Sequence, residues 1–439
     1  MLLLHISDIH FRAPECTQEN DPNRAYRTRM IQDAKARART LGGVDAILVG
    51  GDIAYRGVQS EYTAASMWLE QLARESGCPL ERIFVVPGNH DIDRSRISGS
   101  RQICNIHKAI KDATPAHRYR ELQAQLAEAA TGRALFEPLA AYNEFAARFN
   151  CQVFHERLAW KQDLVLAPGM TLRIHGFTST LLSGAVTEDG QNDKQLSLYL
   201  SPWQTALLDP DPNIVNLVMA HHPPDWLMDQ DEVEDAVHGR AAIHLWGHKH
   251  RQRINKDDQY LRLAAGAVNP DAGEPGWHPA YNLIELSVQG SGPARALHVN
   301  AHLLEWQTNP ERYRARQDTQ GREVFQHLIH CPGDDHPTPP ATGPSAPSAG
   351  PALVGVTAIP APTPDVEAAM GEKFTRNLVI RWWELPMAAR REIALRLGLI
   401  SEDEISLPEP ERYARALMRA KERNQLEQVA EEINNWPTH

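Results

Sequence analysis

The sequence has 439 residues, which at about 150 residues per domain suggests two or three domains. Hydrophobic residues make up 42% and charged residues 23%, and no apolar run reaches about 18 residues, so a wholly disordered chain and a transmembrane helix are excluded. Lys and Arg number 45 against 56 Asp and Glu, and the resulting net charge of −11 disfavours capture of nucleic acid by the surface as a whole, although a local basic patch remains compatible with it.

The apolar run Met1–Leu4 ends at His5, which makes it too short for the core of a signal peptide. The five cysteines form no Cys-x-x-Cys pair, and an odd number cannot all pair within one chain. We therefore expect a reduced protein located in the cytoplasm, without a membrane anchor.

Short apolar runs of the kind found in buried strands recur through the first three quarters of the chain. They are residues 2–6, 46–49, 83–86, 214–219 and 242–245. Each run is followed by a polar segment, and helical stretches separate most of them. This pattern predicts a layered α/β domain whose site lies at one edge of its sheets.

Residues 94–150 have a helical composition and predict a helical insertion beside the site. Between residues 94 and 133 this segment carries eight basic residues against three acidic ones (Asp112, Glu121 and Glu128). A second basic stretch, residues 24–39, follows the first strand end. Most of these charges are expected to form solvated helix faces, and the alternative is a positive rim that gathers a phosphorylated substrate.

A segment rich in Pro, Ala, Ser, Thr and Gly divides the chain. Ten of the 31 prolines lie between Pro332 and Pro364, and residues 336–364 contain no Asp, Glu, Lys or Arg. Such a composition cannot bury enough apolar surface to offset its ordering entropy. We predict three parts: a domain over residues 1–330, a flexible linker over residues 331–365 and a small all-helical domain over residues 366–439.

The residues that end the predicted strands have the chemistry of metal ligands. They are two Asp, one Asn and four His: Asp8, His10, Asp52, Asn89, His221, His248 and His250. Oxygen and imidazole ligands without thiolates suit Mn, Fe, Zn or Ni. Seven ligands are too many for one ion but fit two ions that share a carboxylate, and two ions about 3.5–4 Å apart can clamp the oxygens of a phosphoryl displacement.

The series Asp8-x-His10, Gly51-Asp52, Gly88-Asn89-His90-Asp91, His221-x-Pro223 and Gly247-His248-x-His250 resembles the calcineurin-like metallophosphoesterases over roughly residues 1–310. The resemblance implies a β-sandwich flanked by helices, with a two-metal site at the strand ends. It implies that Asp8, His10, Asp52 and His250 hold the first ion. Asn89, His221 and His248 would hold the second, with Asp52 bridging.

The same resemblance implies that His90 approaches the scissile phosphate and protonates or stabilises the leaving oxygen, and that Asp91 orients its imidazole. His222, next to His221, is expected to fill the loop rather than to bind metal. Arg12, two residues after His10, is a candidate contact for a substrate phosphate, the alternative being that it makes none.

These observations predict a binuclear metal-dependent phosphoesterase in which a metal-bound hydroxide attacks phosphorus and His90 assists the leaving group. A phosphodiester, such as a nucleotide, is the preferred substrate, because the basic insertion after His90 can hold a second substituent. The alternatives are a nuclease acting on DNA or RNA, which the basic stretches favour and the net charge disfavours, and a phosphomonoesterase. The alternative outside the enzymes is a signalling scaffold.

The C-terminal segment predicts helices over residues 386–397, 413–420 and 426–433 from its apolar spacing. Its sequence resembles small helical adaptor domains of the death-like type, which are attached to effector enzymes of bacterial conflict and signalling systems. The resemblance implies that residues 366–439 bind a protein partner. A regulatory or dimerising tail is the alternative.

Overall fold

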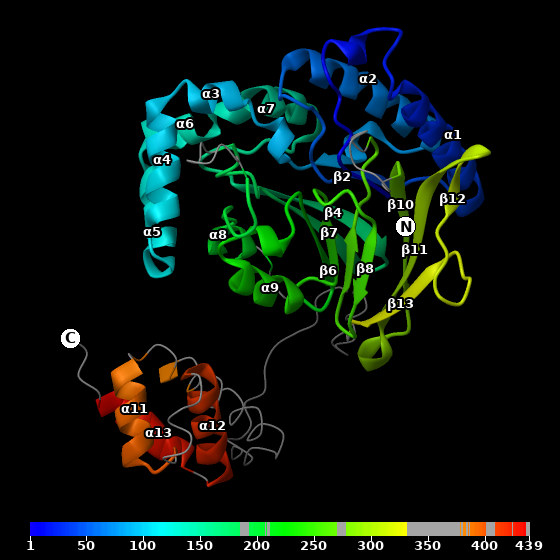
Figure 1. The fold of residues 1–439 in the computed structure, drawn as a ribbon. Helices are drawn as coiled ribbons and strands as arrows, with labels where there is room; N and C mark the ends of the chain where they lie inside the picture. Colours follow the sequence, from blue (N-terminus) through cyan, green and yellow to red (C-terminus); the bar gives the residue numbers. More distant parts are fainter. Residues whose placement is uncertain are drawn as a thin grey trace, which may run out of the picture. The chain divides into compact units, whose positions relative to one another are not determined.

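The structure is a computed structural model, and its helices and strands are drawn in Figure 1. It describes residues 1–184, 193–206, 208, 211–269, 278–331, 378, 381–382, 385, 387–400, 409–423 and 425–435. The chain divides into two compact units, Met1–Thr338 and Pro339–His439. The predicted linker over residues 331–365 lies outside the described residues except for Cys331, so its conformation stays a prediction.

The first unit contains two β-sheets. The seven-stranded sheet has the order β12-β11-β10-β1-β2-β3, with β13 also paired to β11. Its strands are β1 (Leu2–Ile6), β2 (Ala46–Val49), β3 (Ile83–Val85), β10 (Ala280–Gln289), β11 (Ala296–Thr308), β12 (Glu311–Ala315) and β13 (Phe325–His330). Because β1, β2 and β3 are parallel, their carboxyl ends meet at one edge.

The second sheet has six strands in the order β4-β5-β6-β7-β9-β8. They are β4 (Ala159–Ala167), β5 (Met170–Phe177), β6 (Ile214–Ala220), β7 (Ile243–Trp246), β8 (Arg253–Lys256) and β9 (Leu261–Ala264). The strands β5, β6, β7 and β9 are parallel. The five strands predicted from apolar runs are all present, because a parallel strand buried on both faces needs a continuous apolar sequence.

The two sheets share one hydrophobic core. Phe84 of β3 packs on Trp160 of β4 with ring centroids 6.0 Å apart, and the Trp160 indole donates to the Val85 carbonyl oxygen over 3.0 Å. This packing confirms the α/β class with two sheets and flanking helices.

Helices cover the outer faces of the sheets, as Figure 1 shows. They include α1 (Arg24–Leu41), α2 (Gln59–Ser76), α8 (Pro202–Thr205) and α9 (Gln230–His238). Helix α1 buries Met30, Ile31, Ala34 and Ala38 on one side and ends at Gly42, whose φ of 99° lies in the left-handed region that favours glycine.

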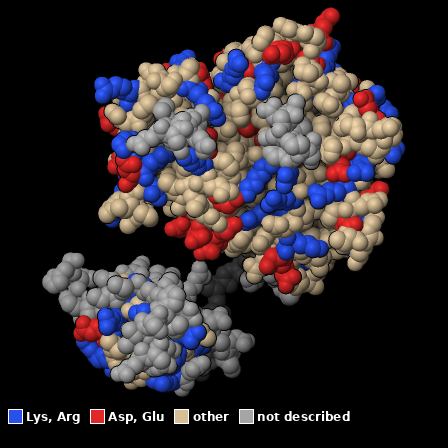
Figure 2. All heavy atoms as spheres, in the orientation of Figure 1, with Lys and Arg blue, Asp and Glu red and all other residues tan. Residues whose placement is uncertain are grey.

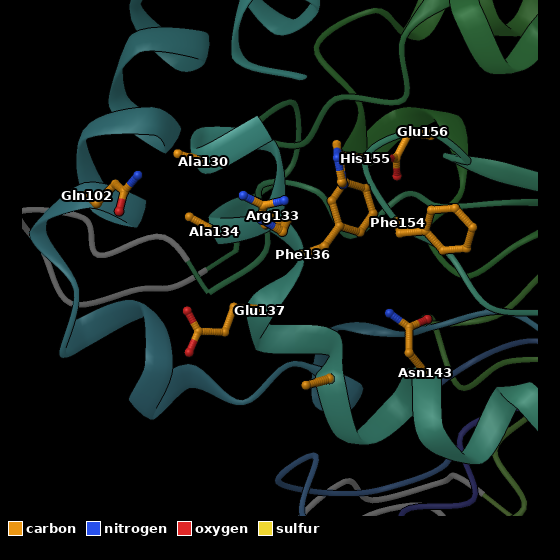
Figure 3. Close-up of a pocket in the computed structure, with 11 residues that line it drawn as sticks. Gln102, Ala130, Arg133, Ala134, Phe136, Glu137, Asn143, Phe154, His155 and Glu156 are labelled. Carbon is orange, nitrogen blue, oxygen red and sulfur yellow. Dashed lines mark ion pairs between the residues drawn. The ribbon is translucent and has the colours of Figure 1, made fainter. Parts of the chain in front are cut away.

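The segment between His90 and β4 is helical, as its composition predicts. It contains α3 (Arg94–Ser98), α4 (Arg101–Asp112), α5 (Pro115–Ala127), α6 (Ala129–Phe136) and α7 (Ala140–Ala146). An open hollow of about 570 Å³ lies on this insertion, and Arg133, Phe136 and Phe154 are among its lining residues (Figure 3).

The second unit is helical. It contains α11 (Met387–Arg396), α12 (Glu409–Glu422) and α13 (Leu426–Asn435). These helices surround a separate core that includes Trp382, Ile393, Tyr413 and Val429. The apolar positions spaced at i, i+3, i+4 and i+7 therefore predict the helices of this unit.

Candidate metal centre

The loops that follow the parallel strands adopt strained backbone conformations at the predicted ligands. Five of the eight non-glycine residues with positive φ in the described part of the chain are predicted ligands: Asp8 (56°), His10 (50°), Asp52 (51°), His248 (67°) and His250 (53°). A side chain in this region is disfavoured, and such strain concentrates at functional sites. Hydrogen bonds between two of the loops hold these conformations in place, since the amides of Ile9 and His10 both donate to the Asp52 carbonyl oxygen.

Asp52 lies at the centre of the cluster. Its Oδ2 is 3.2 Å from His10 Nε2 and 3.2 Å from His221 Nε2. Its Oδ1 accepts a hydrogen bond from the His90 backbone amide over 2.8 Å. The side chain is almost completely buried. One carboxylate therefore faces imidazoles that come from both sheets.

Asn89 faces three imidazoles. Its Oδ1 is 3.2 Å from His221 Nε2, 3.2 Å from His222 Nε2 and 3.1 Å from His248 Nδ1. Asp8 faces the other side of the cluster, with Oδ1 3.1 Å from His250 Nε2. All seven predicted ligands are thus brought together, and His222, expected only to fill the loop, joins them.

Four overlapping groups of these side chains have ligand atoms within 4.8 Å of one another. Asp8, His10 and His250 form one group, and His221, His222 and His248 form another. Asp52 belongs to two groups that connect them, one with His10 and His90 and one with Asp8 and His221. A donor set of two carboxylates, an amide oxygen and imidazoles, divided in this way, fits two adjacent metal ions.

The ring nitrogens that point away from the cluster have partners of their own. His221 Nδ1 donates to the Gly50 carbonyl oxygen over 2.8 Å, and His222 Nδ1 lies 2.9 Å from Ser179 Oγ. His10 Nδ1 lies 3.4 Å from the Asn269 carbonyl oxygen. Such contacts fix the tautomer and the orientation of a histidine that ligates metal.

The electrostatics of the cluster separate its imidazoles. Burial alone would lower the pKa of His221, but the Asp52 and Asp8 carboxylates outweigh burial and raise the pKa to about 9. Burial, together with the charge of His221, lowers the pKa of His248 to about 3. The pKa of Asp52 stays well below its usual range despite burial, because His221, His90 and His10 stabilise the charged carboxylate.

His90 borders the cluster, with its ring centroid 4.9 Å from that of His10. Its Nδ1 lies 2.9 Å from the Tyr55 carbonyl oxygen, which only accepts, so Nδ1 carries the hydrogen and Nε2 is left for another partner. The Tyr55 ring stacks on the imidazole at 4.8 Å with an interplanar angle of 25°. Burial lowers the pKa of His90 although the Asp52 charge opposes the effect.

Asp91 does not have the expected position beside the His90 imidazole. Its carboxylate accepts hydrogen bonds from the amides of Ile53, Ala54 and Gly88 and from the Tyr62 hydroxyl, at 2.8–3.2 Å. Burial, with the charge of Asp52 adding to it, raises the pKa of Asp91 to about 6. The orientation of His90 is therefore set by the Tyr55 carbonyl oxygen, because the short η3 turn (Asn89–Asp91) directs the two side chains apart.

Arg12 lies over the Tyr55 ring, with its guanidinium carbon 3.6 Å from the ring centroid. Arg12 and His90 thus both contact Tyr55 at the border of the cluster. Glu61 positions the backbone at Tyr55 and next to Arg12, since its carboxylate accepts from the amides of Tyr55 and Ala13 over 3.1 and 3.0 Å. The structure therefore brings Arg12 near the cluster through an aromatic contact.

Sequence reasoning missed Tyr55, Glu61 and Trp226. The Trp226 ring meets the His248 ring edge-on at 4.0 Å. No motif spacing marks these residues, because each reaches the site from a neighbouring loop or helix. The one available signal was the position of Tyr55 three residues after Asp52, on the same strand-end loop.

The comparisons with known proteins give two family matches. A model described as calcineurin-like phosphoesterase matches residues 1–252, and a model described as GTPase-associated adaptor domain matches residues 375–435. No curated protein sequence matches the chain.

Three of the solved structures that match the chain are described by their identity, coverage and TM-score. Vps29 of Chaetomium thermophilum has 12% sequence identity and a TM-score of 0.30, covering 76% of this chain and 100% of its own. GAP50, the anchor in the inner membrane complex of Plasmodium, has 9% sequence identity and a TM-score of 0.38, and the match covers 76% of this chain and 90% of GAP50. The purple acid phosphatase PPD1 of yellow lupin (Lupinus luteus) seeds has 11% sequence identity and a TM-score of 0.37, and the match covers 80% of this chain and 57% of PPD1. Likenesses this distant carry no inference about activity.

Two further observations concern the cysteines and the helices. All five cysteine thiols are unpaired. Within the described residues, the helices are too short or too polar to cross a bilayer.

Proposed function

Because the chain belongs to the calcineurin-like phosphoesterase family, we propose that it is a binuclear metal-dependent hydrolase of a phosphodiester. The observation that carries this proposal is the convergence of two carboxylates and six imidazoles from both sheets into overlapping groups, with the Asn89 amide oxygen facing three of the imidazoles. A protein without a metal-dependent reaction has no use for so many strained, buried donors. The observation also speaks against a pure scaffold.

In this proposal Asp8, His10, Asp52 and His250 would hold one ion. Asn89, His221 and His248 would hold the other, with Asp52 shared. His222 is a further donor for the second position, since its Nε2 faces Asn89 Oδ1 at 3.2 Å and Ser179 holds its other nitrogen. Two ions bound there, of Mn, Fe, Zn or Ni, would lower the pKa of a water between them and neutralise charge on the phosphoryl oxygens.

The residues of the chain supply the remaining steps. Hydrolysis joins a water oxygen to phosphorus and breaks the bond to the leaving oxygen, which takes up a proton. A protonated His90 would donate this proton from Nε2 while the Tyr55 carbonyl oxygen retains the Nδ1 hydrogen. Because burial lowers the pKa of His90, the negative charge of the bound substrate has to favour the protonated form. Asp91 acts as a positioning residue through the backbone amides of Ile53, Ala54 and Gly88.

Two observations support a diester over a monoester. Arg12, stacked on Tyr55, offers a second cation beside His90. The helical insertion that follows His90 starts with Arg94 and carries the excess of basic residues noted in the sequence. A phosphodiester whose second substituent carries a further phosphate, as in a nucleotide or a nucleic acid, offers these cations a second anion, whereas a simple monoester offers none.

The test is hydrolysis of bis(p-nitrophenyl) phosphate and of p-nitrophenyl phosphate with Mn²⁺, with chelator, and with His90→Ala. His117→Ala is the matched control, because His117 is exposed on the insertion. We expect chelator-sensitive cleavage of the diester that His90→Ala reduces about 10²–10⁴-fold and His117→Ala leaves unchanged. Preference for the monoester would refute the diester assignment, and absence of bound metal would refute the enzyme and leave the scaffold.

We further propose that residues 366–439 recruit a protein partner. The matching family model is described as an adaptor associated with GTPases, so a partner that carries or accompanies a GTPase domain is the class we propose. No carboxylate and histidine cluster of the metal-binding kind occurs in the described part of this unit. Deleting residues 366–439 should abolish partner capture and leave hydrolysis by residues 1–330 unchanged, and a loss of hydrolysis would refute the division of labour.

A further inference from the structure

Two pockets that share Arg253 and Asn255 lie along β8, and one of them is lined by chain neighbours of the candidate ligands. The first, of about 160 Å³, is lined by Pro223, Gly247 and Lys249, which are chain neighbours of the candidate ligands, and by Arg253 and Asn255 of β8. The second, of about 560 Å³, shares Arg253 and Asn255 and continues along Lys256 to residues 316–327. We call the two together the β8 groove. Its inner end lies beside the site, and its outer end lies between β8 and β13.

The groove has an excess of positive charge. Three of its six Lys and Arg side chains are neutralised by acidic residues of the groove, in the ion pairs Lys249–Asp225, Arg262–Glu234 and Arg322–Asp318. The other three cations are Arg253, Lys256 and Arg316. None of the described carboxylates pairs with them, and within the described residues the Arg316 guanidinium donates to the Gln252 carbonyl oxygen over 2.9 Å.

The positive charge of the β8 groove is visible on the surface of the molecule. Figure 2 shows Lys and Arg side chains gathered over β8, next to acidic side chains over α9. Arg253 and Lys256 are exposed on β8. The exposed Asp257 and Asp258 follow directly after the strand, so the positive strip ends there. A positive strip thus runs along β8 on a protein whose net charge is −11.

The inner pocket also holds hydrogen-bond donors that lack acceptors. Both Trp246 and Arg262 line it, and the buried Trp246 Nε1 and Arg262 Nε have no partner in the described part of the chain. Trp246 is only 1% exposed. Both atoms are enclosed by protein, so the pocket offers a ligand its cations rather than these two donors. Phosphate oxygens match this positive charge.

We propose that the β8 groove binds the phosphate backbone of a single nucleic-acid strand whose scissile phosphodiester lies in the metal centre. This proposal rests on the proposed phosphodiesterase function, which supplies the scissile phosphodiester. The cations of the groove are the reason for choosing a nucleic acid as the class of substrate. A strip of cations beside a phosphodiesterase site favours a chain of repeated phosphodiesters, because consecutive phosphates can follow the strip away from the site. One four-residue strand, about 13 Å long, offers cations to one strand of phosphates rather than to both strands of a duplex.

Binding to a fluorescein-labelled 15-residue oligo(dT), measured by fluorescence anisotropy with the full chain in EDTA, tests the groove without cleavage. Three phosphate contacts predict a slope of about −2 for log K against log salt concentration, at about −0.7 per contact to a single strand. Arg253→Glu should weaken binding about tenfold and make the slope less steep by about 0.7. Lys256→Glu should act in the same direction, which guards against misfolding of either variant.

The matched control is Arg312→Glu, because Arg312 is also exposed but lies on β12 and lines neither pocket of the groove. We expect it to leave affinity within about twofold. Equal loss of affinity in Arg253→Glu and in the control Arg312→Glu, or loss in Arg312→Glu alone, would overturn the groove. Tighter binding of a duplex, or equal binding of poly-glutamate, would overturn the single-strand assignment.

The same preparation separates this proposal from the proposed function. Binding in EDTA without Mn²⁺-dependent cleavage of the small diester would refute the phosphodiesterase and support the groove. Cleavage of the small diester without binding of oligo(dT) would refute the groove and support the phosphodiesterase.

Discussion

Gly247→Ala is expected to disturb the metal centre through a single added methyl group. Gly247 joins β7 to His248, and its amide donates to the His221 carbonyl oxygen over 3.0 Å. A Cβ atom there would lie 2.2 Å from Ser7 Oγ, 2.9 Å from the Gly50 carbonyl oxygen and 3.0 Å from His221 Nδ1. All three distances are shorter than ordinary van der Waals contact, so the neighbouring loops have to move.

The size of the effect follows from which atoms can yield. The Ser7 hydroxyl can rotate, but the Gly50 carbonyl oxygen and His221 Nδ1 form a 2.8 Å hydrogen bond that orients the imidazole. Overpacking of this kind costs about 1–3 kcal/mol of folding stability. Displacing a group that orients a metal ligand lowers metal affinity about 10–100-fold. Both changes are expected in Gly247→Ala.

Urea unfolding and Mn²⁺ titration calorimetry measure the two effects. Gly169→Ala is the control, because Gly169 has a φ of 74° and no atom within 4 Å of an added Cβ, so only backbone strain of about 1 kcal/mol is expected there. Adding Ser7→Ala to Gly247→Ala removes the closest atom and should recover part of the stability. Unchanged Mn²⁺ affinity in Gly247→Ala, or an equal loss in Gly169→Ala, would refute the reasoning.

Three further predictions concern other parts of the chain. Tyr55→Leu removes the ring that Arg12 and His90 both contact and should raise KM for the diester more than about threefold; steady-state kinetics showing an unchanged KM would contradict a role for these contacts in binding. His107→Leu should flatten the acid dependence of unfolding, because burial, with Lys111 adding to it, lowers the pKa of His107 in the folded chain to about 4. The unfolded chain, with a pKa near 6.5, binds the proton more tightly, so this histidine makes stability fall as the pH drops from about 6.5 to about 4, by about 2 kcal/mol at pH 5. Urea unfolding at pH 7 and 5 should therefore show a loss about 2 kcal/mol smaller in the variant, and an equal loss would contradict the assignment. Trp382→Ala empties the core of the C-terminal unit and should cost it roughly 3–5 kcal/mol; calorimetry should then show the transition of that unit lost and the main transition kept, and an unchanged trace would contradict the separate core.

Much of the architecture was predictable from local patterns. The runs at residues 2–6 and 46–49 are almost entirely apolar because parallel strands bury both faces, and every residue of β1 and β2 is buried in the structure. Polar residues that follow such runs lie at one edge because parallel strands share a direction. The helices of the insertion were predictable from composition, and those of the C-terminal unit from the 3.6-residue period of apolar positions. Composition and period are properties of residues that are close together in the sequence.

The partners of individual side chains depended on the tertiary structure. His222 faces Asn89, 133 positions earlier in the chain, and the Gly50 carbonyl oxygen that orients His221 is 171 positions away. Nothing in the local sequence records such contacts, because they depend on which strands become neighbours and on left-handed turns that redirect a side chain.

His90 and Asp91 show the limit most clearly. From the order of residues alone it follows that a histidine and a carboxylate come after the third strand of the domain. The folded chain alone shows that Asp91 turns inward to three backbone amides while His90 turns outward to Tyr55. The reason is that adjacent residues in a tight turn point in different directions, and the loops packed around the turn decide which side chain faces the core and which faces the site.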